Sequence, residues 1–191
     1  IGNWKCSKCF YKTPRLDVSD SPFYPLLGKY NKFNTLAAVA VCLQIGLNSE
    51  QILNGLKQFK PAFGRQEEIT RNGKKIKLFL SKNPTSFNES LRTIKNAKTL
   101  LMVLNDRTPD GKDVSWIWDI DFENLLTSPK IIISGDRAYD LGIRLKYAGF
   151  NKLRLIENLN KAVKFSLRET KDKQTLHILP TYSAMLEVRE I

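Results

Sequence analysis

Short apolar runs alternate with amphipathic stretches across the second half of this chain, and this rhythm constrains the fold more than any other feature. Residues 100–104 and 131–133 are apolar at every position, which is typical of parallel strands buried on both faces. Two further short runs follow, and the stretches beside them carry apolar residues at helical spacing. The sequence therefore predicts a Rossmann-like α/β domain with a mixed, mostly parallel sheet over residues 65–191. We predict its later strands over 153–156 and 176–179, and its later helices over 138–148, 159–168 and from 181 onward.

The first half of the chain has a different pattern. Asn72-Gly73 lies between alternating polar and apolar residues and is a strong signal for a two-residue hairpin turn. Asn83 can cap a helix that begins at Pro84, since proline is well tolerated at the first helical position. Further upstream, apolar residues recur at helical spacing, and Asn48 or Ser49 can cap a second helix. The predicted elements are helices over 31–45 and 49–59, a hairpin over 66–80 and a helix from 84 onward.

The charge of the chain is strongly positive. Its 31 lysines and arginines outnumber 19 aspartates and glutamates, so the formal net charge is +12. Such a surface favours phosphates, nucleic acid or anionic lipid headgroups, although a solvated basic face explains it equally well. The basic residues are spread along the chain, whereas a nucleic-acid-binding protein usually concentrates them. No apolar run approaches the 18 residues of a membrane-spanning helix.

The chain begins at Ile1, and no charged-then-apolar leader follows, so we expect it to be part of a longer protein. Three cysteines without a leader indicate a reducing compartment. Cys42 lies among apolar residues of a predicted helix, and we expect it in the core.

Cys6 and Cys9 form a Cys-x-x-Cys pair, which is half of a four-cysteine zinc site. Tetrahedral zinc needs two more ligands, and the single histidine, His177, lies in a strand-like run near the far end. The missing ligands lie upstream of Ile1, or the pair is a redox pair or a relic. Aromatic residues that alternate on both sides of the pair resemble the strands of a zinc ribbon and favour the first alternative.

Several catalytic patterns are absent from the sequence. It contains no Gly-x-x-x-x-Gly-Lys-[Ser/Thr] phosphate loop and no Gly-x-Gly-x-x-Gly dinucleotide fingerprint. With one histidine in a strand-like run and a core-like Cys42, no Ser–His or Cys–His pair is indicated. We therefore expect this chain to lack a catalytic triad of its own.

Three polar residues are candidates for holding a nucleotide. Asn31 and Asn34 are three positions apart at the start of a predicted helix, so both amides can face a purine edge. Arg65 follows a glycine at a break between modules, where a guanidinium can reach phosphate oxygens. Helix capping explains the asparagines equally well, and a solvated side chain is the simpler explanation for the arginine.

The loop over residues 105–121 is the richest in chemistry. It follows the apolar strand 100–104, so its acids lie at the carboxyl end of that strand, where open parallel sheets bind ligands. The loop can bind a metal, although its spacing does not match a calcium loop. One aspartate can instead orient a histidine of another protein, or the loop can be purely structural. Its five carboxylates, which surround two tryptophans, are Asp106, Asp110, Asp113, Asp119 and Asp121.

At these polar signatures the sequence resembles the Mur ligase family, which includes folylpolyglutamate synthases. The resemblance is carried by Asn31-x-x-Asn34-x-Leu36-Ala37-Ala38, Gly64-Arg65-x-Glu67 and Asn83-Pro84. Further segments resemble the MurT family, the Mur ligase-like subunits of lipid II isoglutaminyl synthases, and extend this likeness over nearly the whole chain. They are residues 110–119, 134–138, 144–149 and 182–186.

The resemblance implies a domain division in which this chain is the C-terminal half of such a subunit. Residues 1–25 would end a zinc-ribbon-like insertion and its linker, with Cys6 and Cys9 as half of the zinc site. Residues 26–64 would be the last helical part of the central ATP-binding domain, and residues 65–191 the Mur ligase C-terminal α/β domain. The phosphate loop would lie upstream, so this chain alone would be inactive.

The resemblance also implies a reaction, the ATP- and Mg-dependent amidation of the D-glutamate α-carboxylate of the lipid II stem peptide. Ammonia would come from a GatD-like glutamine amidotransferase subunit. Asn31 and Asn34 would meet adenine and Arg65 the ATP phosphates. An aspartate of the C-terminal domain would complete the triad of the partner, and we expect Asp113, with Asp119 next. The protein would be cytoplasmic, with peripheral contact to the inner membrane face and no nucleic acid.

One residue departs from the family pattern. Lys82 stands before Asn83, where Mur ligases typically have histidine. Two alternatives remain open: another Mur-type amino-acid or peptide ligase, and a basic module that binds nucleic acid or serves as a scaffold.

Overall fold

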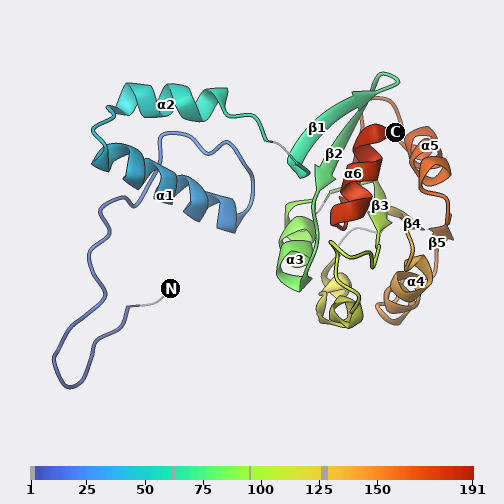
Figure 1. Cartoon of the computed structure of the whole chain (residues 1–191), viewed down its shortest axis with the longest axis horizontal. Coiled ribbons are helices and arrows are strands. Elements are labelled where there is room, and N and C mark those ends of the chain that lie inside the picture. The colour runs from blue at the N-terminus through green and yellow to red at the C-terminus, as the bar shows by residue number, and fades with distance from the viewer. Residues whose placement is uncertain (1–2, 62, 95, 126–128) are drawn as a thin grey trace. The chain divides into compact units, whose positions relative to one another are not determined.

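The computed structural model describes residues 3–61, 63–94, 96–125 and 129–191 (Figure 1). The chain divides into two compact units, Ile1–Phe59 and Lys60–Ile191, which are described separately. Among the residues described, none of the helices qualifies as a candidate membrane span.

The first unit contains the cysteine pair and two helices. Lys5 and Lys12 form an isolated antiparallel bridge around the pair. Helix α1 (Lys29–Gln44) and helix α2 (Ser49–Gln58) confirm the two predicted helices. Asn48 caps α2 as expected, because its side chain accepts a hydrogen bond from the Gln51 N–H and the Gln51 side chain accepts one in return.

One expectation for this unit is only partly met. Cys42 is half-buried in the described unit rather than fully enclosed, and its neighbours Val41 and Leu43 are exposed. Only Asn31, Thr35 and Val39 of α1 are buried. The apolar periodicity therefore predicted the helix correctly, but this unit does not cover most of the apolar surface of α1.

The second unit contains a six-stranded sheet with the strand order β1-β2-β6-β3-β4-β5. The first two strands form the predicted antiparallel hairpin, and all other neighbouring strands are parallel. Asn72 and Gly73 both have positive φ, as this type of two-residue turn requires. The mixed, mostly parallel sheet is thus confirmed. Its strands are β1 (Arg65–Arg71), β2 (Lys74–Phe79), β3 (Thr99–Val103), β4 (Lys130–Ser134), β5 (Leu153–Leu155) and β6 (Thr175–Pro180).

Helices cover both faces of this sheet (Figure 1). Side chains alternate between the faces along each strand, so Leu100 and Met102 of β3 join one core cluster and Leu101 and Val103 join the other. The first cluster packs against α3 (Pro84–Thr93), the 3-10 helices η1 (Ser115–Asp119) and η2 (Phe122–Asn124), and α4 (Ala138–Tyr147). The second packs against α5 (Leu159–Glu169) and α6 (Tyr182–Glu190).

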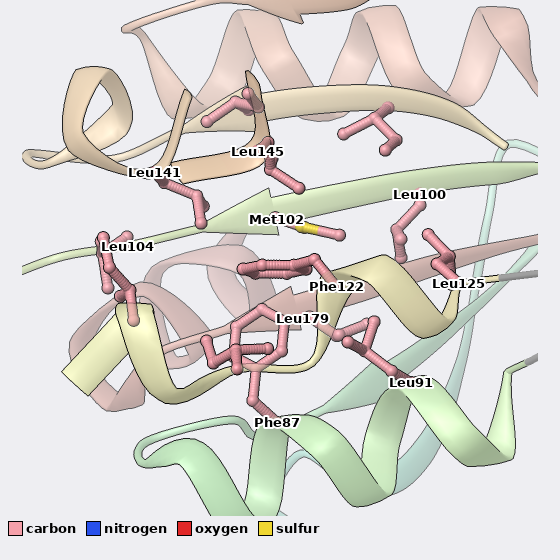
Figure 2. Close-up of a cluster of buried hydrophobic side chains, with 14 of the residues drawn as sticks. Phe87, Leu91, Leu100, Met102, Leu104, Phe122, Leu125, Leu141, Leu145 and Leu179 are labelled. Carbon is pink, nitrogen blue, oxygen red and sulfur yellow. The ribbon is translucent and has the colours of Figure 1, made fainter. Parts of the chain in front are cut away.

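Figure 2 shows how tightly the first cluster is filled around one aromatic ring. The Phe122 side chain is fully buried and meets Phe87 of α3 edge-on, with ring centroids 5.4 Å apart. Leu141 and Leu145 reach the same cluster from α4. The loop after β3 therefore carries core residues of its own, which fixes its 3-10 segments against the domain.

The single histidine gives the fold a predictable pH dependence. His177 is half-buried on β6, and this burial, with Lys77 nearby, holds its pKa below the usual value of 6.5. The unfolded chain therefore binds this proton more readily, so the associated stability is present above pH 6.5 and is lost as pH falls below it. We expect the free energy of unfolding to decrease between pH 7.5 and 5.5, with a slope of at most about 1.4 kcal/mol per pH unit. Urea titrations should show this decrease, and His177→Leu should flatten it; an unchanged slope in that variant would contradict the assignment.

Candidate functional site

The carboxyl edge of the parallel strands brings together three loops. The loop after β3 carries the aspartates, the turn after β4 carries Gly135, and the turn after β6 begins at Thr181. Asn105 joins all three, and its side chain is buried. Its backbone N–H donates to Thr181 Oγ1 at 3.0 Å, its Nδ2 donates to Ser183 Oγ at 2.9 Å, and its Oδ1 accepts from the Asp136 N–H at 3.1 Å. This edge is therefore a rigid polar platform.

Three of the five loop aspartates serve this platform or the fold around it. Asp110 accepts hydrogen bonds from the backbone N–H and the hydroxyl of Ser183, at the start of α6. Asp106 pairs with Arg137 at 3.3 Å, and Asp121 lies 3.6 Å from Arg92. These contacts anchor the loop to α4, α6 and α3, which favours structural roles for the three carboxylates.

Asp113 is placed differently. Its side chain is exposed, and its carboxylate accepts a hydrogen bond from the Ser115 backbone N–H at 2.8 Å, which fixes it at the start of η1. Hydrogen bonds from the backbone and hydroxyl of Ser115 hold the pKa of Asp113 below its usual range, so the group is charged at neutral pH. It borders an open hollow of about 320 Å³. The hollow is lined by Lys112, Asp113, Val114, Ser115, Ile117, Trp118, Arg137 and Asp140.

Asp119 closes the same 3-10 helix and is also exposed. Its backbone oxygen accepts from Asn88 Nδ2 at 3.4 Å, while within the described ranges its carboxylate makes no hydrogen bond or ion pair. Asp113 and Asp119 are exposed and pair with no cationic side chain in the described ranges, whereas Asp106, Asp110 and Asp121 have partners on other elements. The structure does not assign a chemical role to Asp113 or Asp119.

Exposed apolar side chains, most of them aromatic, continue from Trp118 at the hollow along α4. Tyr139, Ile143 and Tyr147 follow one another at helical spacing and are more than half exposed. Trp118 is half exposed and meets the Tyr147 ring edge-on, with centroids 5.5 Å apart. Aromatic side chains beside an accessible charged group are typical of protein–protein contact surfaces.

A buried arginine connects α4 to the loop that carries Trp118. Arg144 of α4 donates to both carboxylate oxygens of Glu123, at 2.8 and 3.0 Å, and to the Ile120 carbonyl at 2.6 Å. Its guanidinium also lies 5.6 Å from the centre of the Trp118 ring. The side chain is only 6% exposed, so the loop closes over it. Sequence analysis missed this residue, although a charged position on the apolar face of a helix was a signal for it.

Replacing Arg144 should loosen the loop. We expect Arg144→Met to lower the free energy of unfolding by about 2 kcal/mol, since it leaves the Ile120 carbonyl and Glu123 without their donor. The effect stays below that of a fully buried pair because Glu123 is 55% exposed. Lys146→Met, an exposed change on the same helix, should cost less than about 0.5 kcal/mol. Urea unfolding gives the loss of free energy of unfolding in each variant. Equal losses in the two variants would contradict the stabilising role of Arg144.

The predicted nucleotide residues lie in both units. Asn31 and Asn34 share one face of α1, where Asn34 Nδ2 lies 3.5 Å from Asn31 Oδ1. Asn31 is buried and donates to the Leu27 carbonyl at 2.7 Å, whereas Asn34 is exposed. Arg65 begins β1 in the second unit, where its side chain is exposed. Their role in binding a nucleotide stays a prediction.

Cys6 and Cys9 lie in one tight turn inside the bridge between Lys5 and Lys12. The backbone N–H groups of Cys9 and Lys8, followed by the Cys9 thiol, donate to the Cys6 sulfur and hold the pKa of Cys6 below its usual value. Two sulfurs in one tight turn suit half of a zinc site. Within the described ranges no group of three or more His, Cys, Asp or Glu side chains could hold a metal.

Comparison with known proteins extends over the whole chain. Residues 80–185 match the family model described as MurT ligase C-terminal. The chain is 34% identical, over its full length, to the lipid II isoglutaminyl synthase (glutamine-hydrolyzing) subunit MurT of Streptococcus pneumoniae, of which the match covers 48%. It is 36% identical over 70% of its length to the corresponding Staphylococcus aureus (strain COL) protein, of which the match covers 32%.

Solved structures show the same fold. MurF from Acinetobacter baumannii superposes with a TM-score of 0.62 and 25% identity, over 90% of this chain and 39% of that one. Mycobacterium tuberculosis folylpolyglutamate synthase complexed with ADP superposes with a TM-score of 0.63 and 17% identity, over 88% and 41% of the two chains. The predicted Mur ligase-like α/β fold is therefore confirmed, and the chain spans at most half the length of these relatives.

Proposed function

Because this chain belongs to the MurT ligase C-terminal family, we propose that it forms the C-terminal half of the ligase subunit of a lipid II isoglutaminyl synthase. The observation that carries this proposal is 34% identity along the entire chain to a subunit with that name. The domains would divide as the resemblance implies: residues 1–25 in the zinc-ribbon-like insertion and linker, 26–64 in the central ATP-binding domain, and 65–191 in the C-terminal domain.

The proposed reaction is the amidation of a carboxylate. ATP phosphorylates the α-carboxylate of D-glutamate in the lipid II stem peptide, which yields an acyl phosphate and ADP. Ammonia attacks the acyl carbon, the C–O bond to phosphate breaks, and a proton leaves the nitrogen to give D-isoglutamine and inorganic phosphate. Both steps concentrate negative charge, which cationic and amide donors can stabilise.

The residues of this chain would contribute binding and orientation. Asn34, supported by Asn31, presents an exposed amide suited to the edge of adenine. Arg65 offers a guanidinium for phosphate oxygens, and Mg would accompany the nucleotide. Cys6 and Cys9 would provide two of four thiolates to a structural zinc ion, whose chemistry is to fix the local fold.

Asp113 would act on a second protein. Ammonia is proposed to come from a GatD-like glutamine amidotransferase subunit whose cysteine and histidine lack an aspartate. Asp113 is charged, accessible and fixed in place by Ser115. An aspartate that orients the histidine of a partner needs these three properties. The exposed Trp118 borders the same hollow as Asp113, and Tyr147 of α4 meets the Trp118 ring, which suits a protein contact. Asp119 is the second candidate for this role.

We place the complex in the cytoplasm, in peripheral contact with the inner membrane face where lipid II is presented. An ADP-release assay with the intact protein, including any segments that flank this chain, and a glutaminase subunit tests the proposal. ADP should form only when lipid II, ATP and either glutamine or ammonia are all present. ADP formation that instead requires a free amino acid would identify another Mur-type ligase, and no lipid II-dependent turnover would overturn the proposal.

A further inference from the structure

The face of α5 that points away from the sheet is basic along its length. Lys161, Lys164 and Arg168 are exposed, and their spacing of three and four positions places them on one side of the helix. Arg154 of β5 joins them, because its guanidinium lies 5.5 Å from the centre of the Phe165 ring. We call these four residues the basic ridge.

Nearby carboxylates do not neutralise the basic ridge. Glu157 accepts a hydrogen bond from the Tyr139 hydroxyl at 2.6 Å, and Glu169 pairs with Lys130. In the part of the chain that the structure describes, no carboxylate lies within ion-pair distance of the four ridge side chains. The helix of 11 residues is about 16 Å long, so three of these charges are held within a short span.

The ridge and the Asp113 loop belong to opposite faces of the sheet. The apolar side of α5 packs in the core cluster that contains Leu101 and Ile132, whereas η1 and α4 pack in the cluster of Leu100 and Met102. A large partner can therefore occupy the ridge and leave the hollow beside Asp113 accessible.

We infer that the basic ridge is the surface through which this domain contacts an anionic membrane. The inference rests on the proposed function, since a lipid-linked substrate requires the enzyme to work at a bilayer. Lys and Arg side chains on one helix face complement a layer of anionic headgroups. Single-stranded nucleic acid would fit less well, because the exposed rings of Tyr147 and Trp118, which could stack with bases, lie on the other face and add no stacking surface to the ridge.

Vesicle co-sedimentation tests this inference without a substrate. The 191-residue chain should bind vesicles rich in phosphatidylglycerol, bind pure phosphatidylcholine vesicles weakly, and lose affinity as salt increases. Each basic group at such a surface strengthens binding about fivefold, so the triple variant Lys161→Gln/Lys164→Gln/Arg168→Gln should bind on the order of a hundredfold less tightly.

A matched variant removes the same charge elsewhere. Lys75→Gln/Lys98→Gln/Lys146→Gln replaces three exposed lysines from scattered positions and should lose less than about tenfold. Circular dichroism should show that both variants are folded. Equal losses in the two triples, or equal binding to both vesicle types, would overturn the inference. Tighter binding to short nucleic acid than to vesicles, lost in the ridge variant, would also overturn the inference.

A turnover assay separates failure of this inference from failure of the proposed function. In the intact complex, the ridge variant should amidate detergent-solubilised lipid II at the unchanged rate and amidate vesicle-embedded lipid II more slowly. If the ridge variant amidates vesicle-embedded lipid II as fast as the parent complex does, the membrane role of the ridge is contradicted and the proposed function is not affected. If neither the parent complex nor the variant amidates lipid II while vesicle binding still depends on the ridge, the proposed function fails and the membrane contact stands.

Discussion

Replacement of Asp113 by asparagine should lower glutamine-dependent amidation on the order of 10³- to 10⁴-fold and leave ammonia-dependent amidation unchanged. The amide oxygen can still accept the hydrogen bond from Ser115 that fixes the side chain, so the loop keeps its shape. It no longer carries the charge that would stabilise the imidazolium of the partner and select its tautomer. Rates with glutamine and with ammonium, measured on the intact complex, separate the two nitrogen sources.

Asp119→Asn is the matched control for this prediction. Asp119 lies at the other end of the same 3-10 helix and is also exposed, so its replacement should reduce the glutamine-dependent rate less than tenfold. If Asp119→Asn greatly lowers the glutamine-dependent rate while Asp113→Asn keeps a normal rate, Asp119 is the residue that orients the histidine of the partner. Equal loss of the ammonia-dependent rate in Asp113→Asn would show that the residue supports the ligase reaction itself.

The second large effect is expected at Gly135, in the turn between β4 and α4. Its φ of +101° is a conformation that L-residues rarely adopt, and an added Cβ would lie 2.5 Å from the Leu104 carbonyl oxygen and 2.7 Å from Asn105 Oδ1. We expect Gly135→Ala to lower the free energy of unfolding by about 3 to 5 kcal/mol, through backbone strain and steric overlap together. The overlap falls on the side chain that joins the three loops, so the platform should be disturbed as well.

Gly149→Ala measures the cost of backbone strain without steric overlap. Gly149 has a φ of +92°, but no atom of the described residues other than its own and those of its chain neighbours lies within 4 Å of its added Cβ. Its replacement should therefore cost only about 1 to 2 kcal/mol. Urea unfolding curves of both variants provide the comparison, and a Gly135→Ala chain as stable as Gly149→Ala would contradict the close approach at Leu104.

The strands and helices could be predicted because their signals are local. The apolar run of β3, the Asn72-Gly73 turn and the cap at Asn83 each depend on a few adjacent residues, and each was confirmed. The position of β6 between β2 and β3 is not encoded locally, since it depends on pairing across the whole domain. Apolar spacing also could not show how much of α1 this unit would cover, which is why Cys42 is less buried than expected.

The different environments of the loop aspartates could likewise not be predicted from the local sequence. Proximity to the end of β3 placed Asp106 and Asp110 at the edge where β3, β4 and β6 end, but the residues that engage them are far away in the chain. Asp110 meets a residue 73 positions away, and Asp106 meets one 31 positions away. Only the folded sheet shows that these two carboxylates are held while Asp113 remains accessible beside a hollow.

We propose that the intact protein, together with its glutaminase partner, transfers nitrogen from glutamine to a lipid-linked carboxylate. The most direct measurement supplies the intact protein and its glutaminase partner with ATP, lipid II and glutamine labelled with ¹⁵N at the side-chain amide. The label should appear in the α-carboxamide of D-isoglutamine, with one ADP formed for each amide. Asp113→Asn should lower this transfer from glutamine on the order of 10³- to 10⁴-fold and leave amidation by free ammonia unchanged. Lipid II that remains unlabelled, or that gains an amino acid in place of an amide, would contradict the proposed transfer.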